Sequence, residues 1–144
     1  MQVQQIMTKS PACCAPDTPL REAARMMVEN DCGAIPVLDG QFRLIGVITD
    51  RDIACRGVAQ GSGPDAFVQS VMSNPVVTAT LEASLEDCCN ALAMNRIRRI
   101  PIVDENGTCC GMLSQADIAL CGPEKEIADL VSTVSKPSAE PSLS

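Results

Sequence analysis

Two stretches of the chain place their apolar residues at the spacing of an amphipathic α-helix. Counting from Leu20, apolar residues recur at i, i+3, i+4, i+7 and i+8, and the same spacing recurs from Leu85. This spacing gathers them on one helical face, which is then buried against the rest of the molecule. Two of these positions in the second stretch are Cys88 and Cys89. We therefore expect two helices, with both of these thiols in the core.

Both predicted helices begin with residues that favour a helix start. Thr18 followed by Pro19 supplies a capping side chain and a residue suited to the first turn. Ser84 with Asp87 three positions on has the form of a capping box. These residues predict that Thr18 caps the first helix and that Ser84 caps the second.

Short apolar runs bounded by turn residues predict the strands. Each helix follows one short apolar segment and precedes two runs that are separated by a turn rich in Asp and Gly. A further helix follows each second run, so the predicted order is β-α-β-β-α, and it occurs twice. The predicted strands are residues 11–15, 34–38, 44–49, 76–80, 99–103 and 109–114, and the further helices begin at Asp50 and Gln115. A linker is expected at residues 57–63 and a short helix at residues 64–72.

An internal repeat underlies this order. Residues 7–56 align with residues 72–121 at a constant offset of 65 positions and without a gap. A repeat of this length indicates one structural unit that buries its surface against its copy. The predicted fold class is therefore α/β, of the α+β kind, built from two β-α-β-β-α repeats. Each copy also carries the residues to build the same kind of site.

The composition supports a core and argues against several classes of partner. The 144 residues are 46% hydrophobic, Phe42 and Phe67 are the aromatic residues, and the formal net charge is −7. Such an acidic chain with few stacking side chains is poorly suited to nucleic acid or to an anionic membrane surface. No segment approaches the ~20 apolar residues of a membrane span, and no signal peptide is recognisable. We therefore expect a cytoplasmic protein with neither nucleic acid nor membrane as partner.

Nine cysteines and no histidine raise the question of thiol chemistry. The odd count, the adjacent pairs and the lack of a C-x-x-C motif are a poor pattern for a disulfide framework or a zinc site. The simplest interpretation is that most are small buried apolar residues, and no metal ligand is predicted. A redox or metal sensor is the alternative function, since consecutive strand residues point to opposite faces. Its candidate residues are Cys13, Cys14, Cys32, Cys109, Cys110 and Cys121.

Each copy carries the pattern Gly-φ-φ-Thr/Ser-x-x-Asp (φ apolar) where the last predicted strand meets the following helix. The glycine allows a ligand or another backbone to approach closely. The hydroxyl lies at a helix N-terminus, which favours an anion, and a carboxylate one turn later can accept both hydroxyls of a ribose. The same spacing is also that of a capping box, so a purely structural role stays open. The residues are Gly46, Thr49 and Asp52 in the first copy and Gly111, Ser114 and Asp117 in the second.

Together these elements resemble the cystathionine-β-synthase (CBS) domain, a tandem pair of which forms a Bateman module. The matching residues are Ile6-Met7, Val71-Met72, the Ile-Pro strands at Ile35 and Ile100, and both Gly-φ-φ-Thr/Ser-x-x-Asp-Ile segments. The resemblance is to the stand-alone bacterial type. It implies that the repeats pack sheet to sheet with pseudo-twofold symmetry, and that clefts between them bind AMP, ADP or ATP, or in some members NAD or S-adenosylmethionine.

The resemblance also implies roles for particular residues. Contacts to phosphate are implied for Thr49, Arg51, Ser114, Arg98 and Arg99, and contacts to ribose for Asp52 and Asp117. Because the chain has few aromatic rings, aliphatic side chains are expected to hold the adenine unless Phe42 or Phe67 reaches the cleft. The implied adenine pocket consists of Ile6, Ile35, Pro36, Val37, Val76, Ile100, Pro101, Ile102 and Met112.

The two copies differ at the start of one strand. The second has Arg98-Arg99 where the first has Gly33-Ala34. Phosphate charge needs a positive partner, so we expect only the cleft that contains Arg99 to bind a polyanionic nucleotide well. The alternative is that both arginines are solvated residues at a strand edge.

The sequence thus predicts a regulatory module that binds adenine nucleotides and signals to an unknown effector protein or through its assembly, expected to be a homodimer. No further cofactor is expected, and a CBS protein without a ligand is a further alternative. An enzyme is the weakest class, because the chain has no His and no Ser-Lys signature. The expected organisation is a first repeat at 1–60, a linker and the start of a short helix at 61–70, a second repeat at 71–123, a helix at 124–133 and a disordered tail at 134–144.

Overall fold

The structure is a computed structural model that describes residues 1–74 and 77–121. Its helices are α1 (Leu20–Asn30), α2 (Leu85–Asn95) and α3 (Gln115–Cys121), with a π-helix at Asp52–Gly57 and 3-10 turns at Val3–Gln5, Val58–Gln60 and Val68–Ser70. Its strands are β1 (Thr8–Lys9), β2 (Ala34–Leu38), β3 (Leu44–Thr49), β4 (Ala79–Thr80), β5 (Arg99–Val103) and β6 (Cys109–Ser114).

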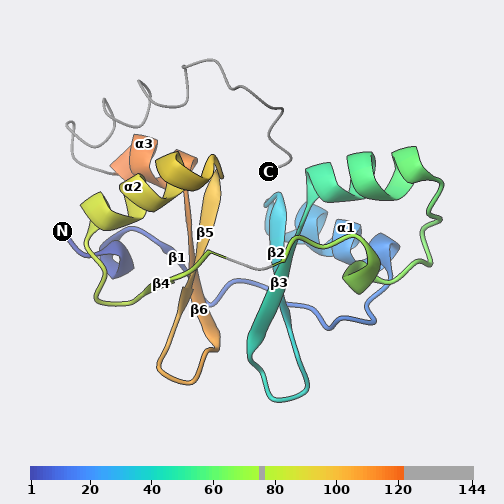
Figure 1. Cartoon of the computed structure of the whole chain (residues 1–144), viewed down its shortest axis with the longest axis horizontal. Coiled ribbons are helices and arrows are strands. Elements are labelled where there is room, and N and C mark those ends of the chain that lie inside the picture. The colour runs from blue at the N-terminus through green and yellow to red at the C-terminus, as the bar shows by residue number, and fades with distance from the viewer. Residues whose placement is uncertain (75–76, 122–144) are drawn as a thin grey trace.

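Two small sheets stand side by side in the middle of the molecule, with helices on their outer sides (Figure 1). One sheet is the antiparallel pair β2–β3. The other has the order β1-β6-β5-β4, in which β5 and β6 are antiparallel and β4 runs parallel to β5. Ala34 and Val47 of the first sheet pack with Met112 of the second. This contact confirms the sheet-to-sheet packing of the two repeats.

The N-terminal segment of each repeat crosses over to the other repeat. The amide of Val3 donates to the carbonyl of Ala83 at 3.0 Å, and the amide of Val68, its equivalent at the offset of 65, donates to the carbonyl of Thr18 at 2.8 Å. Strand β1 pairs with β6, and Ser73 makes the equivalent bridge to β3. These matched contacts are the pseudo-twofold symmetry that the resemblance implies.

Each repeat has its own core beneath its long helix, on the helical face that the sequence pattern predicts, except that Val28 at the end of α1 is exposed because the helix extends past the core there. Because side chains alternate along a strand, one face of β2, β3, β5 and β6 packs on this core and the other looks toward the neighbouring sheet, apart from a register shift near one end of each hairpin. The first core contains Leu20, Ala23, Met27, Ile35, Val37, Ile48, Val68 and Val71. The second contains Val3, Leu85, Cys88, Cys89, Leu92, Ile100, Ile102, Leu113 and Ile118, which confirms both predicted core thiols.

One of the two predicted helix caps is wrong. Pro19 occupies the N-cap position of α1, and the hydroxyl of Thr18 accepts a hydrogen bond from the amide of Ala15 at 3.0 Å instead. The threonine therefore closes the turn before the helix rather than the helix itself. At α2 the prediction is confirmed, since the hydroxyl of Ser84 accepts the amide of Asp87 at 3.1 Å.

The connecting segments also differ from the prediction. Residues 11–15 form no strand beyond one isolated bridge at Cys14, because prolines at both ends of the segment limit its pairing. The helix predicted at 64–72 is only the 3-10 turn Val68–Ser70, since the backbone of this segment bonds to the first repeat. Gly57, predicted in the linker, is buried at the end of the π-helix. Val76, the helix at 124–133 and the tail at 134–144 lie outside the described residues.

Candidate functional site

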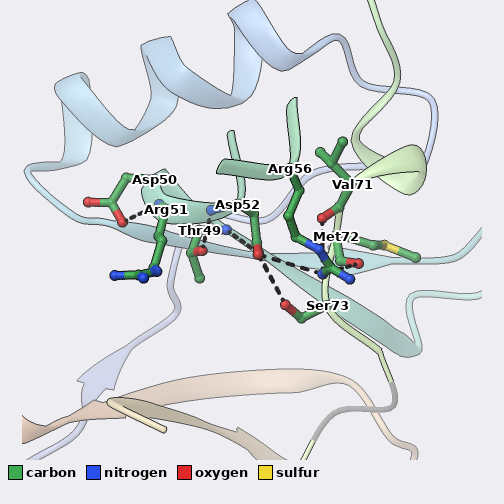
Figure 2. Close-up of polar contacts among 8 residues, drawn as sticks. All are labelled: Thr49, Asp50, Arg51, Asp52, Arg56, Val71, Met72 and Ser73. Carbon is green, nitrogen blue, oxygen red and sulfur yellow. Dashed lines mark hydrogen bonds and ion pairs between the residues drawn. The ribbon is translucent and has the colours of Figure 1, made fainter. Parts of the chain in front are cut away.

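The motif of the first repeat forms a reciprocal cap (Figure 2). The amide of Asp52 donates to the hydroxyl of Thr49 at 3.0 Å, and the amide of Thr49 donates to the Asp52 carboxylate at 3.1 Å. The carboxylate also accepts the Ser73 hydroxyl at 3.2 Å and lies 3.7 Å from the Arg56 guanidinium. With 1% of its surface exposed, Asp52 is held on several sides. The capping role left open by the sequence is therefore present in the structure.

The motif of the second repeat has the same cap with fewer contacts. The amide of Ser114 donates to Oδ2 of Asp117 at 2.9 Å, and the amide of Asp117 donates to the Ser114 hydroxyl at 3.1 Å. Asp117 is only half-buried, and within residues 1–74 and 77–121 its second oxygen has no hydrogen-bond partner. Asp117 therefore has a carboxylate oxygen open to a ligand, whereas Asp52 does not.

The motif glycines make room for methionines of the exchanged segments. A Cβ atom on Gly46 would lie 2.6 Å from the Met72 sulfur and 3.1 Å from the Ser73 carbonyl. On Gly111 it would collide with the sulfur of Met7. The space beside each glycine is thus filled by a thioether from the segment that crosses over. This packing also accounts for the identity of Met7 and Met72 in the repeat.

The three arginines implied for phosphate binding share one property. In the part of the chain that the structure describes, Arg51, Arg98 and Arg99 have no hydrogen-bond or ion-pair partner for their guanidinium groups. Four other arginines do pair with a carboxylate, namely Arg21 with Asp65, Arg25 with Glu22, Arg43 with Asp39 and Arg56 with Asp52. Arg99 is also half-buried, whereas Arg51 and Arg98 are exposed, so solvent would screen an anion less at Arg99 than at the other two.

Arg99 crosses the boundary between the repeats. A Cβ atom on Gly33 would lie 2.6 Å from an Nη atom of Arg99 and 2.9 Å from Oδ2 of Asp50. The guanidinium of the second repeat therefore reaches the start of the helical segment that follows Thr49. Sequence reasoning missed Asp50 and the part played by Gly33. The available signal was their replacement in the second repeat by Gln115 and Arg98.

The residues implied for the adenine pocket divide between two faces of the strands. Four of them, Ile35, Val37, Ile100 and Ile102, are fully buried in the cores beneath α1 and α2. Pro36 is paired with Val47 and Pro101 with Met112, so these side chains are on the strand face that looks toward the other sheet. Ile6 is half-buried against the second core. The structure thus brings Pro36, Pro101 and Met112 to the boundary between the repeats.

Two cysteines from different repeats touch at this boundary. The Cys109 thiol donates to the Gly111 carbonyl at 3.2 Å, and its interaction with the Cys13 thiol lowers the pKa of Cys13, although partial burial acts in the opposite direction. The same contact, together with burial, raises the pKa of Cys109. Burial also raises the pKa of Cys14 to about 11 and that of Cys88 to about 11. Thiolate character is therefore concentrated at Cys13 among these four cysteines.

This difference predicts selective alkylation of adjacent residues. At pH 7.5 we expect iodoacetamide to modify Cys13 about tenfold faster than Cys14, because only thiolates react and the lowered pKa of Cys13 keeps its thiolate populated at lower pH. Tandem mass spectrometry of quenched samples measures both rates. In a Cys109→Ala variant the loss of the interaction that lowers the pKa of Cys13 should slow the alkylation of Cys13. Equal rates for Cys13 and Cys14 in the unmodified chain would contradict the assignment.

The described residues contain neither a group of side chains suited to a metal ion nor a helix suited to crossing a membrane. No group of three or more His, Cys, Asp or Glu side chains lies close enough there to hold a metal ion. No helix of the described part of the chain is both long and apolar enough to cross a membrane.

Comparisons with known proteins agree with the repeat and the fold. A model of the CBS domain matches the chain twice, at residues 3–56 and 68–121. The CBS domain-containing protein YhcV of Bacillus subtilis is 41% identical over 118 residues, which are 82% of this chain and 83% of the relative. Hypoxic response protein 1 of Mycobacterium tuberculosis is 31% identical over 137 residues, 94% and 95% of the two chains.

Solved structures show the same architecture. A crystal structure of Hypoxic Response Protein I with two coordinated zinc ions has a TM-score of 0.77 and 31% identity, covering 85% of this chain and all of that one. The crystal structure of CBSX2 in complex with AMP has a TM-score of 0.71 and 23% identity, covering 83% and 93%. At that identity the likeness to CBSX2 shows the fold alone.

Proposed function

The chain belongs to the CBS domain family, and from this premise we propose that it is a regulatory module that binds an adenosine-containing ligand between its two repeats. The observation that carries the proposal is the set of guanidinium groups of Arg51, Arg98 and Arg99, which have no partner among the described residues. Arginines without carboxylate partners are suited to phosphate oxygens, which accept two parallel hydrogen bonds from a guanidinium. CBSX2, a protein of the same fold, forms a complex with AMP.

The proposed ligand is AMP, ADP or ATP. Thr49 and Ser114 are proposed to contact its phosphates together with the three arginines. Pro36, Pro101 and Met112, on the strand faces that look toward the other sheet, are proposed to contact the adenine. The fully buried core residues Ile35, Val37, Ile100 and Ile102 then support these strands from beneath.

The ribose is proposed to bind at the motif carboxylates, which differ in availability. Asp117 has an open oxygen in the described structure and needs no rearrangement. Asp52 must first exchange the Ser73 hydroxyl or the Arg56 guanidinium for a ribose hydroxyl. This difference supports two sites of unequal affinity.

Binding is expected to raise the melting temperature. At a nucleotide concentration of about 100 times Kd, stabilisation of the folded state is about 2.7 kcal/mol, which for a chain of this size corresponds to a rise of about 8 °C. Thermal-shift measurements with AMP, ADP, ATP, NAD and S-adenosylmethionine test this, with CTP as a control that lacks adenine. The proposal fails if none of the adenosine compounds raises the melting temperature more than CTP does.

The regulatory output is proposed to be a partner protein or a change of assembly, since both family-model matches on this chain are CBS domains. We propose a homodimer as the resting assembly, which light scattering of the free and nucleotide-bound protein measures. The thiol-sensor alternative is not favoured, because the match to the CBS domain and the complex of CBSX2 with AMP support an adenosine ligand instead.

A further inference from the structure

Asp50 and Arg99 face one point at the boundary between the repeats. That point is the position of a missing Cβ atom on Gly33, which lies 2.6 Å from an Nη atom of Arg99 and 2.9 Å from Oδ2 of Asp50. Since glycine has no side chain, a cation of the second repeat and an anion of the first can both approach this place. They form no direct ion pair within the described residues.

This arrangement occurs at only one of the two positions related by the pseudo-twofold symmetry. The residue equivalent to Asp50 is the uncharged Gln115, and the residue equivalent to Arg99 is Ala34. The repeat offset of 65 makes this comparison direct, because both helices begin immediately after a matched strand. A carboxylate that faces an arginine of the other repeat is therefore present at Asp50 and not at the equivalent position, Gln115.

We propose that Asp50 lowers the affinity for nucleotides that bind beside Arg99, and that it lowers this affinity more for the more highly charged nucleotides. This inference rests on the proposed function. The Asp50 carboxylate attracts the guanidinium that a phosphate needs, and it repels the phosphate itself, so its effect grows with each added phosphate charge. Asp50 is exposed, so solvent screens the interaction, and the result is a bias between nucleotides rather than a block.

An Asp50→Asn variant tests the proposal by calorimetric titration with adenosine, AMP, ADP and ATP at low ionic strength. From Coulomb's law near a protein surface, we expect affinity to rise about tenfold for ATP and about threefold for AMP, with adenosine unchanged. The asparagine keeps Oδ1, which in Asp50 accepts the Arg51 amide at 2.8 Å, so the local backbone is preserved. A melting curve of the variant checks its fold.

Glu86→Gln is the matched control, because it removes the same charge from an exposed position in the first turn of α2. It should change each affinity less than twofold. An unchanged preference between ATP and AMP in Asp50→Asn overturns the inference and leaves the proposed function intact. Equal gains in both variants also overturn it, because net charge would then explain them. Failure of the unmodified chain to bind any of the four ligands overturns the proposed function, and the inference with it.

Discussion

Replacing Asp52 by alanine is expected to lower the free energy of unfolding by about 3 kcal/mol, and the melting temperature by about 9 °C. The carboxylate accepts the Thr49 amide and the Ser73 hydroxyl at a position that is 1% exposed. Its loss leaves both donors without a partner in a place where water has little access, and a buried donor without an acceptor costs about 1–3 kcal/mol. The ion pair with Arg56 adds less, because that guanidinium is largely exposed.

Asp117→Ala is the matched control for this prediction. It removes the same capping contact from the second repeat, where the carboxylate is half-buried and accepts only the Ser114 amide among the described residues. The expected loss is about 1 kcal/mol, the usual size of a cap. Urea denaturation followed by circular dichroism measures both variants. Equal losses would show that the contacts of Asp52 with Ser73 and Arg56 contribute nothing to stability.

The strands and the long helices were predictable because their signals are local. The bounds of β2, β3, β5 and β6 agree with the predicted runs, since each run is ended by turn residues. The spacing from Leu20 and from Leu85 likewise places both helices correctly, and their buried faces too except at Val28, which is 82% exposed near the end of α1. The helix cap predicted at Thr18 is wrong because the Thr18 hydroxyl instead accepts a hydrogen bond from the amide of Ala15, in the turn before the helix.

The exchange of N-terminal segments could not be predicted from local pattern. Whether Val3 packs on its own repeat or on the other depends on contacts between residues far apart in the sequence, such as its bond to Ala83, 80 positions away. One signal was present all the same: Met7 and Met72 repeat at the offset that also relates Gly111 and Gly46. Only the structure shows that each methionine packs against one of these glycines.

The candidate site was predictable in its residue types and only partly in its geometry. The sequence singles out Arg51, Arg98 and Arg99, and the structure adds that none of them has a partner among the described residues. Residue spacing cannot reveal a missing ion pair, because pairs such as Arg21 with Asp65 join distant segments. For the same reason, the sequence could not show that Asp50 competes with a phosphate for Arg99. That inference rests on the structure, where both side chains lie beside Gly33.

Replacing Arg99 by alanine is expected to weaken ATP binding about 30-fold. A half-buried guanidinium without a carboxylate partner gains a charge-assisted contact when phosphate arrives, and such contacts are worth about 1.5–3 kcal/mol. Arg99→Lys keeps the charge but loses the planar fork, so its affinity should fall between those of the unmodified chain and Arg99→Ala. Calorimetry gives the affinity, and one tightly bound ATP per chain is expected, because the second repeat presents Arg99 whereas the first has Ala34.

Arg25→Ala is the matched control, since it removes an arginine whose exposed ion pair with Glu22 lies on the surface of α1. Surface pairs of this kind contribute little to stability, so the variant should fold and bind ATP as the unmodified chain does. If Arg99→Ala binds ATP as tightly as Arg25→Ala, Arg99 is a solvated strand-edge residue and not a phosphate ligand. If Arg98→Ala alone shows the loss, phosphate binding does not depend on Arg99, and Asp50 cannot then govern the choice of nucleotide through Arg99.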